Sequence, residues 1–182
     1  MEMEGAEDNA PLPAYTFVPG GPWTHPHRTS GAGLNTVAAG GDEPSRRDKS
    51  WWSGRFLRGI ELFNAGYYWE AHEFWEELWH VEGRRGPTAD VLRALIKLAA
   101  AGVKVRERRA DGVRTHCQRA AVLFASAAEQ GGRRQLGLDL ELLAERAHES
   151  AENPPEDPGP ADAPVTRVYA FRIECSAAEL RS

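Results

Sequence analysis

The residues with the clearest chemical potential lie in one segment, residues 67–80, with the sequence YYWEAHEFWEELWH. At the 100° spacing of an α-helix, His72 and Glu76 fall one turn apart on the same face. That face also carries four aromatic side chains, those of Tyr68, Trp69, Trp75 and Trp79. The remaining polar residues of the segment are expected in the one window that faces water: Glu70, Glu73, Glu77 and His80.

A buried imidazole and carboxylate among aromatic rings need partners, because burial without a hydrogen bond or counter-charge costs free energy. Three interpretations are open. The first is a structural pair, in which Glu76 accepts a hydrogen bond from His72 or binds a cation of a neighbouring helix. The second is a site for a divalent metal ion at His72 and Glu76, with Glu73 and Trp79 beside them. The third is a pocket for a small anionic molecule, in which His72 and Glu76 act as acid and base.

A basic stripe on a later segment bears on all three interpretations. Arg93, Lys97 and Lys104 recur at helical spacing, with small alanines between the two lysines. These cations would pair with Glu76 in the first interpretation, oppose a metal ion in the second and bind an anion in the third. A metal site would also need further ligands, and the candidates are His25, His27, Glu61, His116 or a second subunit. For His116 and Cys117 themselves, the pattern favours plain helix residues.

The distribution of 12 prolines shows which elements must position these residues. Six prolines lie at or before Pro44, five lie between Pro154 and Pro164, and only Pro87 lies in between. Because proline breaks helix interiors, long helices are expected only in the central stretch. We therefore expect three regions: an extended, partly disordered arm over 1–48, a helical bundle domain over 49–152, and a proline-rich linker with an extended tail over 153–182.

Helical periodicity predicts about five helices, over residues 51–64, 67–82, 88–108, 111–130 and 135–150. Asp111 is expected to cap the fourth helix. The connections are short, so the fold class is all-α, an antiparallel helical bundle. Residues 165–173 alternate like a strand, which either pairs with the N-terminal ribbon or lies over the helices. The aromatic residues of that ribbon are expected to dock it on the core; His25 is then either brought to the site or, as the loop context favours, a surface residue.

Composition narrows the class of protein. The net charge is −5, and because the chain has no excess of basic residues, its composition argues against nucleic-acid binding. The acidic start and the lack of a long apolar run argue against a secretory signal or a membrane-spanning helix, which predicts a soluble, cytoplasmic protein. The two cysteines are expected to be free thiols. The partner is expected to be a small molecule or a protein, and the sequence decides neither homo-oligomerisation nor whether the protein is an enzyme.

The stretch FNAGYYWEAHEFWEELW resembles the signature of the domain of unknown function 309 family, small bacterial and archaeal helical proteins marked by the motif HxxxExxW. The motif is matched by His72, Glu76 and Trp79. The resemblance extends to PAYTFVPG, LRALIKLAAAGVKV, the turn at Gly112 and LGLDLELL. It implies a suspected metal site at the His and the Glu, and it implies no reaction. Lys97 and Lys104 stand where members commonly carry Gln and His, which adds positive charge.

Taken together, the residues predict a helical bundle with a metal- or small-ligand-binding site around a buried His72 and Glu76. The supporting residues would be Trp69, Trp75, Arg93, Lys97, Lys104 and His25. A divalent metal ion is the one cofactor that this site suggests. The alternative is a helical protein–protein interaction module, in which the His, Glu and Lys side chains form a purely structural cluster.

Overall fold

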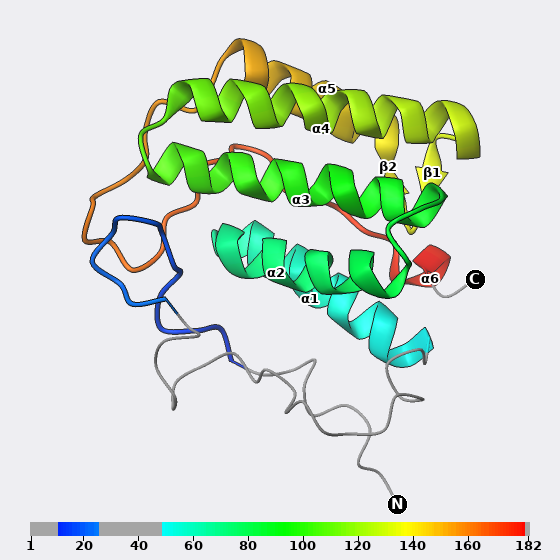
Figure 1. Cartoon of the computed structure of the whole chain (residues 1–182), viewed down its shortest axis with the longest axis horizontal. Helices are drawn as coiled ribbons and strands as arrows, with labels where there is room; N and C mark the ends of the chain where they lie inside the picture. Colours follow the sequence, from blue (N-terminus) through cyan, green and yellow to red (C-terminus); the bar gives the residue numbers. More distant parts are fainter. Residues whose placement is uncertain (1–10, 26–48, 181–182) are drawn as a thin grey trace, which may run out of the picture.

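A computed structural model describes residues 11–25 and 49–180, and within these ranges the chain is mostly helical (Figure 1). The long helices are α1 (Lys49–Ala65), α2 (Tyr68–Val81), α3 (Pro87–Arg106), α4 (Ala110–Gly131) and α5 (Leu140–Glu152). A short α6 (Ala177–Leu180) and a hairpin of β1 (Arg134–Gln135) and β2 (Leu138–Asp139) complete the elements. The predicted all-α bundle is confirmed. Of the expected N-terminal arm, only residues 11–25 are described, so His27 lies outside the described residues.

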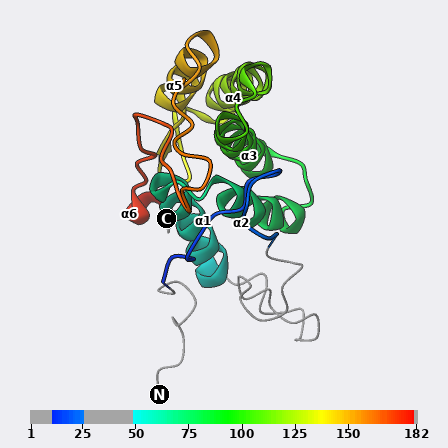
Figure 2. The same ribbon diagram turned by 90° about the vertical axis from the view of Figure 1, so that its left-hand side faces the viewer.

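The long helices pack in the order of the sequence: α1 on α2, α2 on α3, α3 on α4 and α4 on α5. Figure 2 shows α2, α3 and α4 as consecutive neighbours, so that α3 lies between the other two. The turn between α1 and α2 depends on Gly66, whose φ of 99° disfavours other residues. A Cβ at this position would also lie 2.9 Å from the carbonyl oxygen of Thr166. This turn therefore brings the C-terminal segment close to α2.

The start of α5 differs from the prediction. Residues 134–139 form the β-hairpin, and the helix begins at Leu140 rather than at residue 135. Leu136 and Gly137 have φ values of 53° and 72°, as a tight two-residue hairpin turn requires. Asp139 then caps α5, because its carboxylate accepts a hydrogen bond from the backbone N–H of Leu142. The predicted cap at Asp111 is also wrong, since α4 begins at Ala110 after Arg109.

The C-terminal segment, residues 164–176, lies over the helices, and residues 165–173 form no strand. The side chain of Asn64 on α1 binds both backbone groups of Ile173 at 2.8 Å. The backbone N–H of Val168 donates to the hydroxyl of Tyr68, and the hydroxyl of Tyr169 donates to the carbonyl of Leu98. The buried side chains of Tyr169 and Ile173 thereby complete the hydrophobic core.

Arg106, at the end of α3, organises the proline-rich connection that leads to this segment. Its guanidinium donates to the carbonyl oxygens of Pro158 and Ala163 and to the hydroxyl of Thr166. One arginine thus satisfies several backbone carbonyls of a segment that has few N–H donors of its own.

Both cysteines are free thiols, as the sequence predicted. Cys117 is buried, and burial raises the pKa of its thiol to about 11. No helix among the described residues combines the length and apolarity needed to cross a membrane.

Candidate metal site on the second helix

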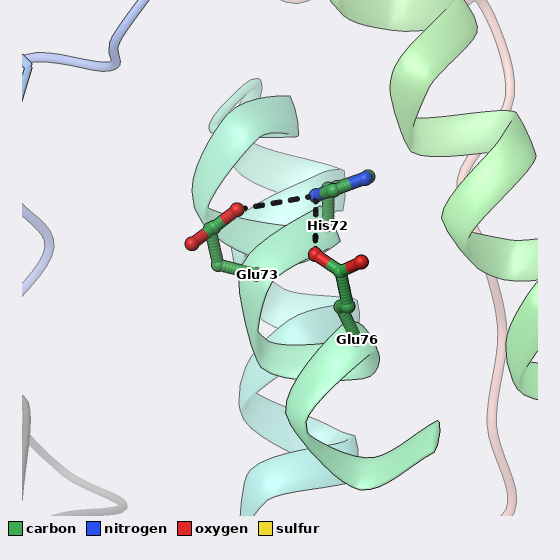
Figure 3. Close-up of side chains that lie close together, drawn as sticks. All are labelled: His72, Glu73 and Glu76. Atoms are coloured by element: carbon green, nitrogen blue, oxygen red, sulfur yellow. Dashed lines mark ion pairs between the residues drawn. The ribbon is translucent and has the colours of Figure 1, made fainter. Parts of the chain in front are cut away.

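The side chains of His72, Glu73 and Glu76 come together on α2 (Figure 3). The Nδ1 atom of His72 lies 3.4 Å from a carboxylate oxygen of Glu73 and 3.9 Å from one of Glu76. One nitrogen and two carboxylate oxygens are therefore all within 4.8 Å of one another. The spacing i, i+1, i+4 allows this because the Glu73 side chain turns back toward the imidazole while Glu76 lies one turn further on.

The cluster is half-buried, and the prediction of a buried His72–Glu76 pair is wrong. The side chains of His72, Glu73 and Glu76 are 25%, 31% and 42% exposed. Partial exposure lets water solvate the carboxylates, so they do not need a buried counter-charge. The Nδ1 atom of His72 is itself buried and has no hydrogen-bond partner among the described residues. A ligand that reaches this nitrogen would satisfy it.

The tryptophans expected around the site have separate roles. The Trp75 side chain is completely buried, and its indole N–H lies 3.4 Å from the carbonyl oxygen of Phe56, which makes it a core residue. Trp79 packs edge-on against His80 and beneath the guanidinium of Arg84. Trp69 stacks beside His72 with 6.1 Å between ring centroids. Of the three, Trp69 is the one with a ring contact to the cluster.

The prediction that Glu70 faces water is wrong, because this residue is only 1% exposed. Its carboxylate accepts hydrogen bonds from the Thr16 hydroxyl at 2.5 Å and from the Phe17 N–H at 2.9 Å. Burial raises the pKa of this carboxyl group above its usual value, and the two hydrogen bonds partly oppose the rise. A helical wheel cannot reveal this role, because the partners come from a segment outside the helix.

The N-terminal ribbon, residues 11–25, lies against α2 and brings His25 near the cluster. The rings of Phe17 and His25 both pack edge-on against Trp69, with centroids 4.8 and 5.4 Å from it. Trp69 thus lies between His25 and His72. His25 contributes no atom to the group of potential metal ligands.

The basic stripe of α3 does not form the expected ion pairs with α2 within the described residues. Arg93 pairs with Asp90 of the same helix at 3.1 Å, and Lys104 pairs at 2.6 Å with Glu107, the residue that follows α3. An ion pair with α2 is formed instead by Arg55 of α1, which lies 3.6 Å from Glu77. Lys97 is half-buried and forms no ion pair with a described residue.

His116 on α4 is a residue that the sequence pattern did not favour for the site. Burial lowers the pKa of its imidazole, and the positive charges of Lys97, Lys104 and Arg119, followed by His72, lower it further. His116 therefore lies within electrostatic reach of both the basic stripe and the cluster. Its Nδ1 atom is buried and has no hydrogen-bond partner within the described ranges.

The fold and the cluster define an all-α protein whose second helix, α2, carries a His/Glu/Glu group. Residues 56–116 match the family described as Domain of unknown function (DUF309). The resemblance to this family is thereby confirmed over most of α1, all of α2 and α3 and the start of α4. The matched segment contains His72, Glu73, Glu76, Lys97, Lys104 and His116. No curated protein matches the chain.

Proposed function

We propose that His72, Glu73 and Glu76 bind a divalent transition-metal ion. The observation that supports this is the convergence of one imidazole nitrogen and two carboxylate oxygens within 4.8 Å. Metal–ligand bonds of about 2.0–2.2 Å place neighbouring ligand atoms roughly 3–3.5 Å apart. The distance of 3.4 Å between His72 Nδ1 and Glu73 falls in this range, and that of 3.9 Å to Glu76 needs only a small side-chain adjustment.

Figure 3 supports Nδ1 as the ligand atom of His72, because the other ring nitrogen points away from both carboxylates. A mixed set of one nitrogen and two oxygens favours Mn²⁺, Fe²⁺, Co²⁺ or Zn²⁺ over Mg²⁺ and Ca²⁺, which prefer oxygen alone. Three protein ligands leave at least one position for water or a further ligand, as in catalytic rather than structural metal sites. The chemistry that such a site supplies is polarisation of the bound molecule.

The test is a titration of metal-free protein, purified without an affinity tag, with Co²⁺ and Zn²⁺. Cobalt is followed by its visible absorption bands, which report coordination directly, and zinc by calorimetry. We expect one ion per chain for the wild type. We expect His72→Gln and Glu76→Gln to weaken binding at least about tenfold, since even loss of an outer-shell partner weakens metal binding by about 10–100-fold. The control Glu141→Gln changes an exposed carboxylate on α5 and should bind normally.

The competing interpretation is a purely structural cluster within a protein–protein interaction module. It predicts no stoichiometric metal binding by the wild type, together with a loss of thermal stability in His72→Gln. Metal binding that survives both ligand substitutions would place the ion elsewhere and reject the proposed site.

A further inference from the structure

The positive charge of Lys97 would oppose a metal ion bound at the cluster, and the metal site alone offers this lysine no counter-charge. It lies on α3, the helix between α2 and α4, where the small Ala100 lies between Lys97 and Lys104 on one half-buried stripe. Gly112 of α4 lies against the stem of Lys104, and His116 follows Gly112 by one helical turn, so its imidazole faces the same stripe of α3. Burial lowers the pKa of this imidazole, and the charges of Lys97, Lys104, Arg119 and His72 lower it further. A metal ion at the cluster would add positive charge on α2, which packs on the helix that carries Lys97.

The ion pairs on α3 show which lysine of the stripe is available to bind a ligand. Lys104 is occupied by Glu107, and its side-chain stem lies over Gly112 of α4, where a Cβ would come within 3.0 Å. Lys97 has no ion pair with a described residue and is half-buried, which limits its solvation. Across Ala100, His116 has a buried Nδ1 without a hydrogen-bond partner in the described part of the chain. Two polar groups without partners therefore border the same surface from α3 and α4.

The sum of the charges at the cluster, Lys97 and His116 indicates which ligand would pair with all of them. A divalent ion held by Glu73 and Glu76 is neutralised by the two carboxylates, yet it keeps an open coordination position. An anion at that position would bind the metal on one side and a cation and an imidazole N–H on the other. We propose that the site takes a small oxyanion, a carboxylate or a phosphate, which completes the coordination of the metal and is held by Lys97 and His116. This inference rests on the proposed metal site and specifies the class of its ligand.

In this arrangement Lys97 supplies the charge and His116 supplies a hydrogen bond from its ring. Lys97 alone has opposite effects on the two binding steps, whereas His116 acts on the anion step only. Lys97 disfavours the metal when no anion is present, because like charges repel, and favours it when the oxyanion lies between them. A lysine that serves only the fold would show no such reversal.

The test uses full-length protein loaded with Co²⁺ and titrated separately with acetate and with dilute inorganic phosphate. We expect the visible cobalt bands of the wild type to change with at least one of the two anions, and the one that binds more tightly identifies the carboxylate or the phosphate class. Lys97→Gln should weaken anion binding by about threefold to tenfold and, in anion-free buffer, tighten Co²⁺ binding. Lys97→Arg should restore anion binding. His116→Ala should weaken anion binding while leaving Co²⁺ affinity within about twofold, because His116 is not a metal ligand in this proposal.

Arg114→Gln is the matched control, since it removes an exposed cation from α4 near His116 and should behave as the wild type. The outcomes separate the two proposals. Wild-type protein that shows no cobalt bands would overturn the metal site and the oxyanion with it. Normal cobalt bands that respond to neither anion, or respond equally in wild type, Lys97→Gln and His116→Ala, would overturn the oxyanion alone.

Discussion

The carboxylate of Glu70 accepts a 2.5 Å hydrogen bond from the hydroxyl of Thr16, a residue 54 positions earlier in the chain. Both side chains are almost completely buried. This contact fixes the N-terminal ribbon on α2 two residues before His72. The same helix therefore serves two purposes: one face holds a segment of the chain in place, and the adjacent positions carry the candidate metal ligands.

The raised pKa of Glu70 predicts a particular dependence of stability on pH. Because the folded-state pKa lies above the ordinary value of 4.5, the folded protein binds a proton more tightly than the unfolded chain. The resulting stabilisation is complete below pH 4.5 and is lost as the pH rises through the folded-state pKa. We expect Glu70→Gln to remove this loss, so its stability relative to wild type increases with pH above 4.5. Urea unfolding at a series of pH values measures the difference, and a constant difference would contradict the assignment.

Thr16→Val should destabilise the protein by about 1.5–3 kcal/mol, because it leaves a buried carboxylate oxygen without one of its hydrogen bonds. The substitution keeps the size of the side chain, so packing changes little. Urea unfolding gives the free energy, and limited proteolysis should show faster cleavage within residues 11–25. Thr24→Val, at an exposed position of the same ribbon, should behave as the wild type.

Gly59 on α1 lies directly against the ring of Trp75, where an added Cβ would come within 2.3 Å of the indole nitrogen. Gly59→Ala should therefore destabilise the protein by about 1–3 kcal/mol through overpacking. Gly112→Ala is the matched control for a glycine-to-alanine change in a helix, because its Cβ would meet only the flexible stem of Lys104 at 3.0 Å. We expect this second variant to be neutral or to gain up to about 1 kcal/mol from helix propensity. Thermal or chemical unfolding measures the stability of both variants, and a Gly59→Ala protein as stable as Gly112→Ala would show that Trp75 can move aside.

Asn64→Ala should cost about 2–4 kcal/mol, because it leaves both buried backbone groups of Ile173 unpaired. Asn64→Asp keeps the acceptor for the Ile173 N–H but removes the donor to the Ile173 carbonyl. The loss of unfolding free energy in this variant therefore reports the lost donor together with the burial of a charge. Hydrogen exchange at Ile173 provides a local measurement. Protection that is unchanged in Asn64→Ala would mean that the tail is held by its side chains alone.

The sequence contains enough periodicity to predict the helical bundle, because apolar spacing and the distribution of proline act locally. Spacing on one helix also places His72 and Glu76 one turn apart, whereas it assigns Glu73 to the water-facing window, and only the bend of its side chain brings that carboxylate to His72. The hairpin at residues 134–139 escaped prediction because the turn at Leu136 and Gly137 precedes a helical pattern that obscures it.

The errors at the site share one physical origin, which is contact between segments far apart in sequence. A helical wheel places Glu70 toward water, yet a ribbon from residues 11–25 covers that side of the helix. In the same way, the wheel groups Trp75 with His72, although the close approach of α1 at Gly59 draws Trp75 into the core. His116 belongs to another helix, α4, and its place against α3 follows from the packing of the two helices, which a wheel of one helix cannot predict.

The clasp between Asn64 and Ile173, 109 residues apart, has a consequence for the protein while it is being made. On the ribosome, α1 through α5 all emerge before residues 164–176, the segment that lies over the helices. During that interval the surfaces later buried by Tyr169 and Ile173, among them the rings of Phe63 and Tyr68, are open to solvent and to other nascent chains. Completion of the core therefore follows synthesis of residues 164–176, and these surfaces are exposed to aggregation until that segment has been made.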